Sequence, residues 1–183
     1  NRFFYEMIES GCSHAVMEVS SHSLILNRVY GLNFITAVFS NITSDHLDFH
    51  QTFEEYLKAK KILFDELSND SFAIINSDDA SGKDIVKNSR AKIVTYGMSE
   101  YSDYRIKDIR YDLNGTEFTI THNKVDYIIN TSLIGTFNAY NATSAFATAH
   151  SLGIDASKIM KGIKSSPQVP GRFEVLGKGR KKV

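Results

Sequence analysis

Two apolar runs of the chain each end in a cluster of acidic, histidine and hydroxyl residues. The first, AVMEV at residues 15–19, is followed by SSH, and the second, FITAVF at residues 34–39, is followed by SNITSDHLDFH. Short apolar runs bounded by polar clusters are typical of buried strands. In open parallel sheets, ligands bind at the carboxyl ends of such strands. The two runs therefore predict a parallel sheet with a candidate active site at its carboxyl edge.

The rest of the chain first alternates between helical and strand patterns and then changes pattern after Gly97. Before that point the sequence predicts helices over residues 2–10, 52–67 and 80–88, and further strands over residues 72–75 and 93–96. Beyond it, alternating apolar positions on both sides of Asn114-Gly115 predict a β-hairpin that extends into a meander ending near Ile129. Two more helices follow, over residues 138–152 and 155–163. We therefore expect an α/β fold, a three-layer domain of the mononucleotide-binding type, with a mostly parallel sheet plus a small antiparallel meander.

The composition argues against several kinds of partner. Lys plus Arg and Asp plus Glu both number 21, so the net charge provides no field that would attract nucleic acid or an anionic membrane. Apolar stretches in the sequence are shorter than a bilayer requires. The single cysteine, Cys12, excludes an intrachain disulfide and suits a reducing compartment. We expect a cytoplasmic protein with no nucleic-acid and no membrane partner.

Residue types that bind metal ions gather in the two polar clusters. Glu18 lies in an apolar run, where a carboxylate is costly unless it is paired, reaches solvent or binds a metal. His46 and His50 are spaced as in some zinc sites, but the chain has a single cysteine and no further closely spaced histidines. Oxygen ligands predominate, including Asp45 and Asp48, and they favour Mg²⁺. The two aspartates have the alternative role of capping a helical turn.

Lys60 is the one charged residue on the apolar stripe of the predicted helix 52–67. Thr52 and Glu55 form a capping-box pattern at the start of this helix. The stripe contains Phe53, Tyr56, Leu57, Lys60, Leu63, Phe64 and Leu67. A lysine in such a position can lay its methylene groups along the core and expose its amine. The other interpretation is a lysine retained in a site, where its amine is reactive.

Two asparagines, Asn138 and Asn141, share a face at the start of the predicted helix 138–152. Asparagines in the first turns of a helix usually form local hydrogen bonds, and these two could equally hold a nucleotide base. The chain contains neither a Gly-x-x-x-x-Gly-Lys-Ser/Thr loop nor a Gly-x-Gly-x-x-Gly motif. For a nucleotide enzyme we therefore expect the phosphate-binding loop to lie outside these 183 residues.

Four motifs, in this order, resemble those of the central domain of the Mur ligases: MEVSSH at residues 17–22, NITSDHLD at 41–48, AK at 59–60 and VPGRFE at 169–174. The resemblance spans nearly the whole chain and is greatest to the branch that adds the third amino acid to the UDP-linked precursor peptide of the cell wall. It implies an ATP-dependent amide ligase. ATP would phosphorylate the terminal carboxylate of the UDP-sugar peptide, and the amine of the incoming amino acid would attack the acyl phosphate. The resemblance further implies a monomer whose partners are these substrates.

The same resemblance implies catalytic and metal-binding roles for three residues. Glu18 and His46 match Mg²⁺ ligands of the family. Lys60 matches a lysine that is carbamylated by CO2, and the resulting anion helps to hold a second Mg²⁺. Lys60 and His46 are therefore the expected catalytic residues.

Four further residues match positions that bind the substrates in the family. Ser20 and Arg28 match residues that contact the UDP-sugar peptide. Asn141 matches an asparagine near the adenine of ATP, and Arg172 matches a linker arginine that reaches the nucleotide phosphates.

The resemblance also divides the chain. Residues 1–166 correspond to the central ATP-binding ligase domain, truncated at its N-terminus and without the phosphate loop. Residues 167–183 correspond to a linker and to the first strand of the C-terminal ligase domain, expected over residues 173–176. We expect this chain alone to be inactive.

Three alternatives remain open at the level of the sequence. A folylpolyglutamate-synthase-like ligase would share the architecture and the modified lysine. A metal-dependent hydrolase could be built on Glu18, His46 and His50, and it would need no ATP. A non-catalytic homologue would keep the fold as a binding module.

Overall fold

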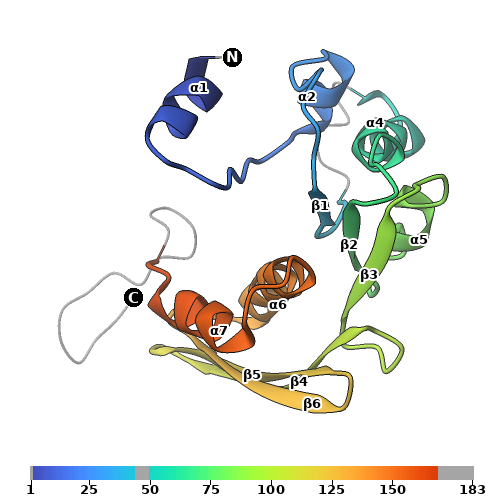
Figure 1. Cartoon of the computed structure of the whole chain (residues 1–183). Helices are drawn as coiled ribbons and strands as arrows, with labels where there is room; N and C mark the ends of the chain where they lie inside the picture. Colours follow the sequence, from blue (N-terminus) through green and yellow to red (C-terminus); the bar gives the residue numbers. More distant parts are fainter. Residues whose placement is uncertain (1, 44–49, 169–183) are drawn as a thin grey trace.

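The computed structural model describes residues 2–43 and 50–168. The elements are α1 (Arg2–Glu9), α2 (Ser21–Ile25), β1 (Thr36–Phe39), α4 (Phe53–Asp65), β2 (Phe72–Asn76), α5 (Gly82–Ile85), β3 (Lys92–Gly97), β4 (Tyr104–Asp112), β5 (Gly115–His122), β6 (Val125–Thr131), α6 (Thr136–Ser151) and α7 (Ala156–Ser165). Figure 1 shows α6 and α7 inside the bend of the sheet, with α4 and α5 outside it.

The described strands form one sheet in the order β1-β2-β3-β4-β5-β6. Neighbouring strands are parallel from β1 to β4 and antiparallel from β4 to β6. The parallel pairing of β3 with β4 is short, since it joins only Tyr96 to Tyr104 and Gly97 to Arg105. The sheet turns at this short pairing from its parallel part into the meander (Figure 1). The predicted α/β fold, with a mostly parallel sheet and a small antiparallel meander, is confirmed.

Strand β2 is buried on both of its faces. Ile74 belongs to the core cluster shared with α6 and α7, whereas Ala73 and Ile75 belong to the cluster shared with α4 and α5. Side chains of a strand alternate between the two faces of the sheet, and a parallel strand covered on both faces reads as a continuous apolar run. This explains the run FAII in the sequence, and it confirms the three-layer arrangement.

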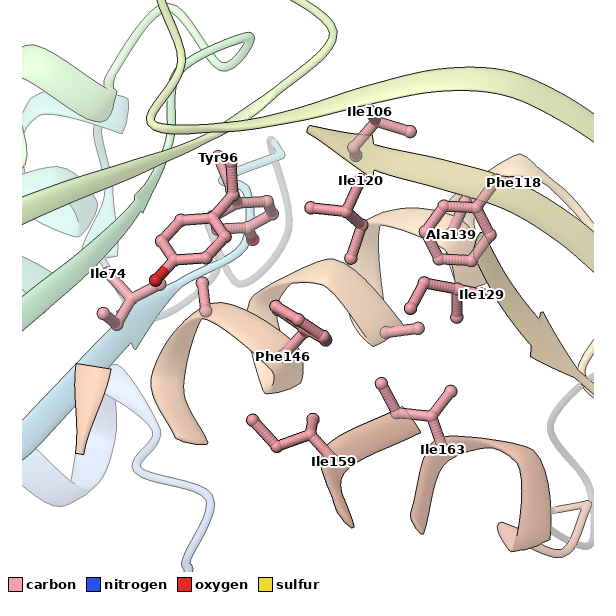
Figure 2. Packing of buried hydrophobic residues seen from close by; sticks show 13 residues of the cluster. Ile74, Tyr96, Ile106, Phe118, Ile120, Ile129, Ala139, Phe146, Ile159 and Ile163 are labelled. Carbon is pink, nitrogen blue, oxygen red and sulfur yellow. The ribbon is translucent and has the colours of Figure 1, made fainter. Parts of the chain in front are cut away.

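Helix α6 fills the concave side of the sheet. Its buried residues are mostly small, so that its backbone approaches the strands closely, and Phe146 is the large exception. Phe146 lies between the strand side chains and those of α7, as Figure 2 shows with Ile120 on one side and Ile159 on the other. The side chain of Phe146 is fully buried. One helix therefore holds the parallel part of the sheet and the meander in a common core.

The start of α4 confirms one half of the predicted capping box, whereas the Thr52 N–H donates to the His50 carbonyl at 2.6 Å. The Thr52 hydroxyl accepts a hydrogen bond from the Glu55 backbone N–H at 3.2 Å. Tyr56 and Phe64 of the predicted stripe are buried, and so is Leu67 beyond the helix end. The amphipathic pattern of the sequence therefore gave the orientation of this helix correctly.

Two of the predicted elements differ from the structure. Residues 15–19 form no strand, and Val16 is fully exposed, because the run lies beside no strand that could complete its hydrogen-bond ladder. The predicted helix 80–88 is confined to Gly82–Ile85. Its continuation, Lys87-Asn88-Ser89, is polar and has no apolar side chain to bury, and it forms turns instead.

The expected strand 173–176 and most of the expected linker lie outside the described residues, while Pro167 and Gln168 belong to neither a helix nor a strand.

Among the helices in residues 2–43 and 50–168, none combines the length and the apolar character needed to cross a bilayer.

A cluster of aromatic and histidine rings closes the far end of α6. The Tyr104 hydroxyl and His150 Nδ1 are hydrogen-bonded at 2.8 Å, and the ring of His122 stacks on Tyr104 with centroids 4.0 Å apart. Burial lowers the pKa of His150, and the nearby His122 lowers it further, while Asp155 opposes them. The cluster therefore favours a neutral His150.

We predict that acidification destabilises the domain through His150. The folded-state pKa of His150 lies below the ordinary value of 6.5, so the unfolded chain binds the proton first as the pH falls. The stabilisation is complete above about pH 6.5 and is lost as the pH falls through the folded-state pKa. His150→Asn keeps an acceptor near the Nδ1 position and does not titrate. In the full-length protein that contains this chain, the variant should lose less thermal stability between neutral and mildly acidic pH than the wild type. An equal loss in both would contradict the prediction.

Candidate functional site

The structure brings two of the sequence motifs, MEVSSH and AK, together with His50 in one cluster, which we call the histidine–lysine cluster. It consists of Ser21 and His22 from α2, His50, and Tyr56 and Lys60 from α4. Ser21 Oγ and His50 Nε2 are hydrogen-bonded at 2.8 Å, and both residues are buried. The His50 ring stacks on Tyr56 with centroids 4.9 Å apart and meets the edge of His22 at 5.5 Å. Helix α2 thereby packs against α4.

Lys60 differs from the two neighbouring lysines of α4. Its Nζ lies 5.0 Å from the centroid of the Tyr56 ring, and its side chain is half-buried. Lys61 forms an ion pair with Asp65 on the same helix, and Lys58 is exposed. Lys60 is therefore the lysine that extends from α4 toward the histidine–lysine cluster. Its position is compatible both with a lysine lying along the core and with a lysine retained in a site.

The other residues predicted near the first polar cluster are exposed. Glu18 lies in the extended segment before α2, and its carboxylate is open to solvent rather than buried in a strand. Ser20 is the N-cap of α2, where its hydroxyl accepts a hydrogen bond from the Ser23 N–H at 3.2 Å. Arg28 follows α2 and is also exposed. Glu18 and Arg28 are thus accessible to a ligand, whereas Ser20 also has a local structural role.

A separate cleft of about 400 Å³ lies at the carboxyl ends of β1, β2 and β3. It is lined by Ser40, Asn41, Asn76, Asp78, Asp79, Tyr96, Thr136, Phe137, Tyr140 and Asn141. Four of these residues belong to the first turns of α6, and the predicted nucleotide-binding residue Asn141 is one of them. The Asn141 side chain also donates a 3.5 Å hydrogen bond to Asn138 Oδ1. Asn138 is buried and bonds back to the Ile134 carbonyl, so it has the local role that the sequence left open.

Polar side chains at the end of β2 connect the walls of this cleft. Asp78 accepts hydrogen bonds from the Tyr140 hydroxyl at 2.7 Å and from the Met98 N–H at 2.6 Å. Asn76 donates to the Ser40 carbonyl at 2.7 Å, and Asp79 accepts from the Ile42 N–H at 3.0 Å. The ends of the three parallel strands and α6 are therefore joined by side chains that follow β2.

Two tyrosines of the cleft remain neutral hydrogen-bond donors. Burial raises the pKa of Tyr96, and it also raises that of Tyr140, to which the hydrogen bond and charge of Asp78 add. The Tyr96 hydroxyl donates to the Phe39 carbonyl at 3.2 Å. Because neither hydroxyl loses its proton readily, both remain available as donors to the Phe39 carbonyl and to Asp78.

The residues after β2 were missed by the sequence analysis. A signal was present in the sequence, since the apolar run FAII is followed by the polar residues Asn76-Ser77-Asp78-Asp79, just as the second apolar run is followed by its polar cluster.

The predicted residues His46 and Arg172 lie outside the described part of the chain. Within that part, no group of three or more histidine, cysteine, aspartate or glutamate side chains is arranged to hold a metal ion.

Comparison with known sequences identifies relatives of the chain. Residues 1–149 match the model of the Mur ligase middle domain. The UDP-N-acetylmuramoyl-L-alanyl-D-glutamate--2,6-diaminopimelate ligase of Cytophaga hutchinsonii is 44% identical over 174 residues, covering 95% of this chain and 35% of that protein. The Listeria monocytogenes ligase of the same name is 39% identical over 183 residues, covering 97% of this chain and 37% of the relative. The chain therefore spans little more than a third of the length of these relatives.

Comparison of structures agrees with this. The structure of a UDP-N-acetylmuramoyl-L-alanyl-D-glutamate--2,6-diaminopimelate ligase superposes with a TM-score of 0.86 at 31% identity, covering 95% of this chain and 37% of that one. The MurF ligase of Thermotoga maritima, solved in complex with ADP, has a TM-score of 0.70 at 21% identity and covers 87% of this chain and 36% of that one. This second likeness concerns the fold alone.

We predict that Ser21 stabilises the histidine–lysine cluster through its buried hydrogen bond. Ser21→Ala removes the bond to His50 and should lower the stability of the domain by about 1 kcal/mol, the net value of a typical hydrogen bond. Thermal unfolding of the full-length protein measures the effect. Ser13→Ala is the matched control, since Ser13 is exposed and bonds only locally to His14. Equal unfolding midpoints for the wild type and both variants would show that the Ser21–His50 contact contributes nothing.

Proposed function

Because the chain belongs to the Mur ligase family through its middle domain, we propose that the full-length protein is an ATP-dependent ligase of peptidoglycan precursor synthesis. The substrate would be UDP-N-acetylmuramoyl-L-alanyl-D-glutamate, and the added amino acid would be 2,6-diaminopimelate. The names of the relatives that cover nearly the whole of this chain support this choice. Of the structural observations, the one that carries the proposal is the cleft at the strand ends with Asn141 in its wall.

The cleft would receive the base and ribose of ATP. Its volume of about 400 Å³ lies within the usual range for small-molecule sites. Its walls offer the amide of Asn141, the amide of Asn41 and the hydroxyl of Ser40, which can exchange hydrogen bonds with a base or a sugar. The carboxylates of Asp78 and Asp79 make the same cleft unfavourable for bare phosphates. The phosphates would therefore extend away from these acids, toward Arg172 and a phosphate loop supplied by other parts of the protein.

The reaction would proceed in two steps, phosphorylation of a carboxylate and attack of an amine on the resulting acyl phosphate. A carboxylate oxygen of the D-glutamyl residue attacks the γ-phosphorus of ATP, the bond to the β-phosphate oxygen breaks, and ADP leaves. The amine of diaminopimelate then attacks the acyl carbon, phosphate departs, and the amine releases a proton as the amide forms. Arg28 and Ser20 would orient the UDP-sugar peptide, since a guanidinium and a hydroxyl can both bind its anionic and polar groups.

Glu18, His46 and a carbamylated Lys60 would hold Mg²⁺. Glu18 is exposed and Lys60 is half-buried, so a carboxylate and a modified amine are accessible to a cation, and oxygen ligands of this kind suit Mg²⁺. When bound, the metal supplies positive charge that offsets the charge on the transferring phosphoryl group. The carbamate forms when the neutral Lys60 amine attacks CO2 and releases one proton, which leaves an anion on the side chain.

The proposal is tested by assaying the full-length protein with ATP, Mg²⁺, the UDP-sugar dipeptide and either diaminopimelate or lysine. With diaminopimelate and ATP, we expect ADP, phosphate and the UDP-sugar tripeptide in equal amounts, and without ATP we expect no tripeptide. A tripeptide that forms with lysine but not with diaminopimelate would overturn the choice of amino acid. Hydrolysis of the substrate in the absence of ATP would instead support a metal-dependent hydrolase.

We predict that Lys60→Ala abolishes ligation, because it removes the amine that would carry the carbamate. A small added carboxylate should restore part of the activity by occupying the vacated position. Steady-state ligation rates with and without the added acid measure both effects. Lys58→Ala is the control, since Lys58 is exposed on the same helix, and it should remain fully active. Undiminished activity of Lys60→Ala would exclude the carbamate role.

A further inference from the structure

Side chains from β2, from β3 and from the segment after β2 hold the end of β1 and the loop that follows it, residues 40–43, which we call the β1 loop. The Phe39 carbonyl accepts from the Tyr96 hydroxyl at 3.2 Å, and the Ser40 carbonyl accepts from Asn76 Nδ2 at 2.7 Å. The Ile42 N–H donates to Asp79 Oδ2 at 3.0 Å. Three contacts thus fix the backbone of residues 39–42, the segment from which Ser40 and Asn41 line the cleft.

Asn76, the last residue of β2, and Asp79, three residues beyond it, are themselves fixed. Asn76 is buried, and its Oδ1 accepts from the Asp78 N–H at 3.0 Å. The second carboxylate oxygen of Asp79 accepts from the Ser81 N–H at 2.8 Å. A Cβ at Gly82 would lie 2.6 Å from the Asn76 carbonyl oxygen, so the absence of a side chain there lets α5 begin directly against β2. Asn76 and Asp79 therefore have little freedom to follow a displaced loop.

Neither side chain is needed for the strand pairing itself. The ladder between β1 and β2 ends with the pair Phe39 and Ile75, one residue before Asn76. Ile42 is buried in the cluster shared with α4 and α5, which attaches the loop to the core independently of Asp79. Loss of either polar contact should consequently loosen residues 40–43 without unfolding the sheet.

We propose that Asn76 and Asp79 are positioning residues for nucleotide binding. They hold Ser40 and Asn41, whose side chains are exposed in the cleft, in the place where a hydroxyl and an amide meet the bound nucleotide. The inference rests on the proposed function, because it takes the ligand of the cleft to be ATP. Both residues also line the cleft, and affinity for the nucleotide depends on the bonds by which they hold the β1 loop.

The test uses two variants of the full-length protein. Asp79→Ala removes both acceptor oxygens and with them the bonds from the Ile42 and Ser81 N–H groups. Asn76→Asp places a carboxylate oxygen against the Ser40 carbonyl where a donor stood. Asp103→Ala is the matched control. Asp103 lies in the loop before β4, where it accepts hydrogen bonds from the backbone N–H and the hydroxyl of Thr95 in β3. It does not line the cleft.

Two measurements are made on each variant. Amide hydrogen exchange of the nucleotide-free protein reports on the loop, and equilibrium binding compares a non-hydrolysable ATP analogue with the UDP-sugar dipeptide. In both variants we expect exchange in residues 40–43 to accelerate about tenfold, as the loss of a hydrogen bond that holds the loop implies. The dissociation constant of the ATP analogue should rise about fivefold or more, by similar reasoning. Exchange in β2 and β3, and the affinity for the UDP-sugar dipeptide, should not change.

Several outcomes would overturn the inference. Unchanged exchange in residues 40–43 would show that the side chains do not hold the loop. Faster exchange with unchanged affinity for the ATP analogue would show that the loop does not position the nucleotide. If Asn76→Asp does not fold, Asp79→Ala alone decides. A wild-type protein that binds no ATP analogue would overturn the proposed function as well, whereas failure confined to the variants would leave that function standing.

Discussion

The burial of β2 on both faces is the constraint on which the rest of the structure depends. A strand with apolar side chains on both sides must be covered twice, and the two covers are α4 with α5 on one face and α6 with α7 on the other. Asn76 ends the strand as a buried residue, and Asp78 and Asp79 follow it at the carboxyl edge because their charged side chains cannot enter either core. There they meet the end of β1 and the first turns of α6. The cleft is therefore a consequence of how β2 is packed.

The sequence predicted those elements whose pattern is local. The apolar stripe and the Thr52 cap specified α4, and the Asn114-Gly115 turn specified the hairpin of β4 and β5, because both signals lie within a few residues. The strand predicted over residues 15–19 was wrong because a strand needs a neighbouring strand as well as apolar residues. Whether such a neighbour exists depends on distant parts of the chain, and a local pattern does not contain that information.

The candidate site was predictable in chemistry but less so in geometry. Asn141 was chosen as a nucleotide-binding residue from the pair of asparagines at the start of its helix and from the resemblance to the family, and the residue does line a cleft. That Ser21 bonds to His50, and that His50 stacks on Tyr56, could not be read from the sequence, since these contacts join segments brought together only by the packing of α2 on α4. The acids after β2 carried a readable signal, an apolar run ending in polar residues, but no motif drew attention to them.

We propose that the nucleotide binds in the cleft beyond β1, β2 and β3. A crystal structure of the full-length protein with Mg²⁺ and a non-hydrolysable ATP analogue tests this most directly. We expect the base in the cleft, within hydrogen-bonding distance of the Asn141 side chain and beside Ser40 and Asn41. A nucleotide bound elsewhere, with this cleft filled only by water, would contradict it.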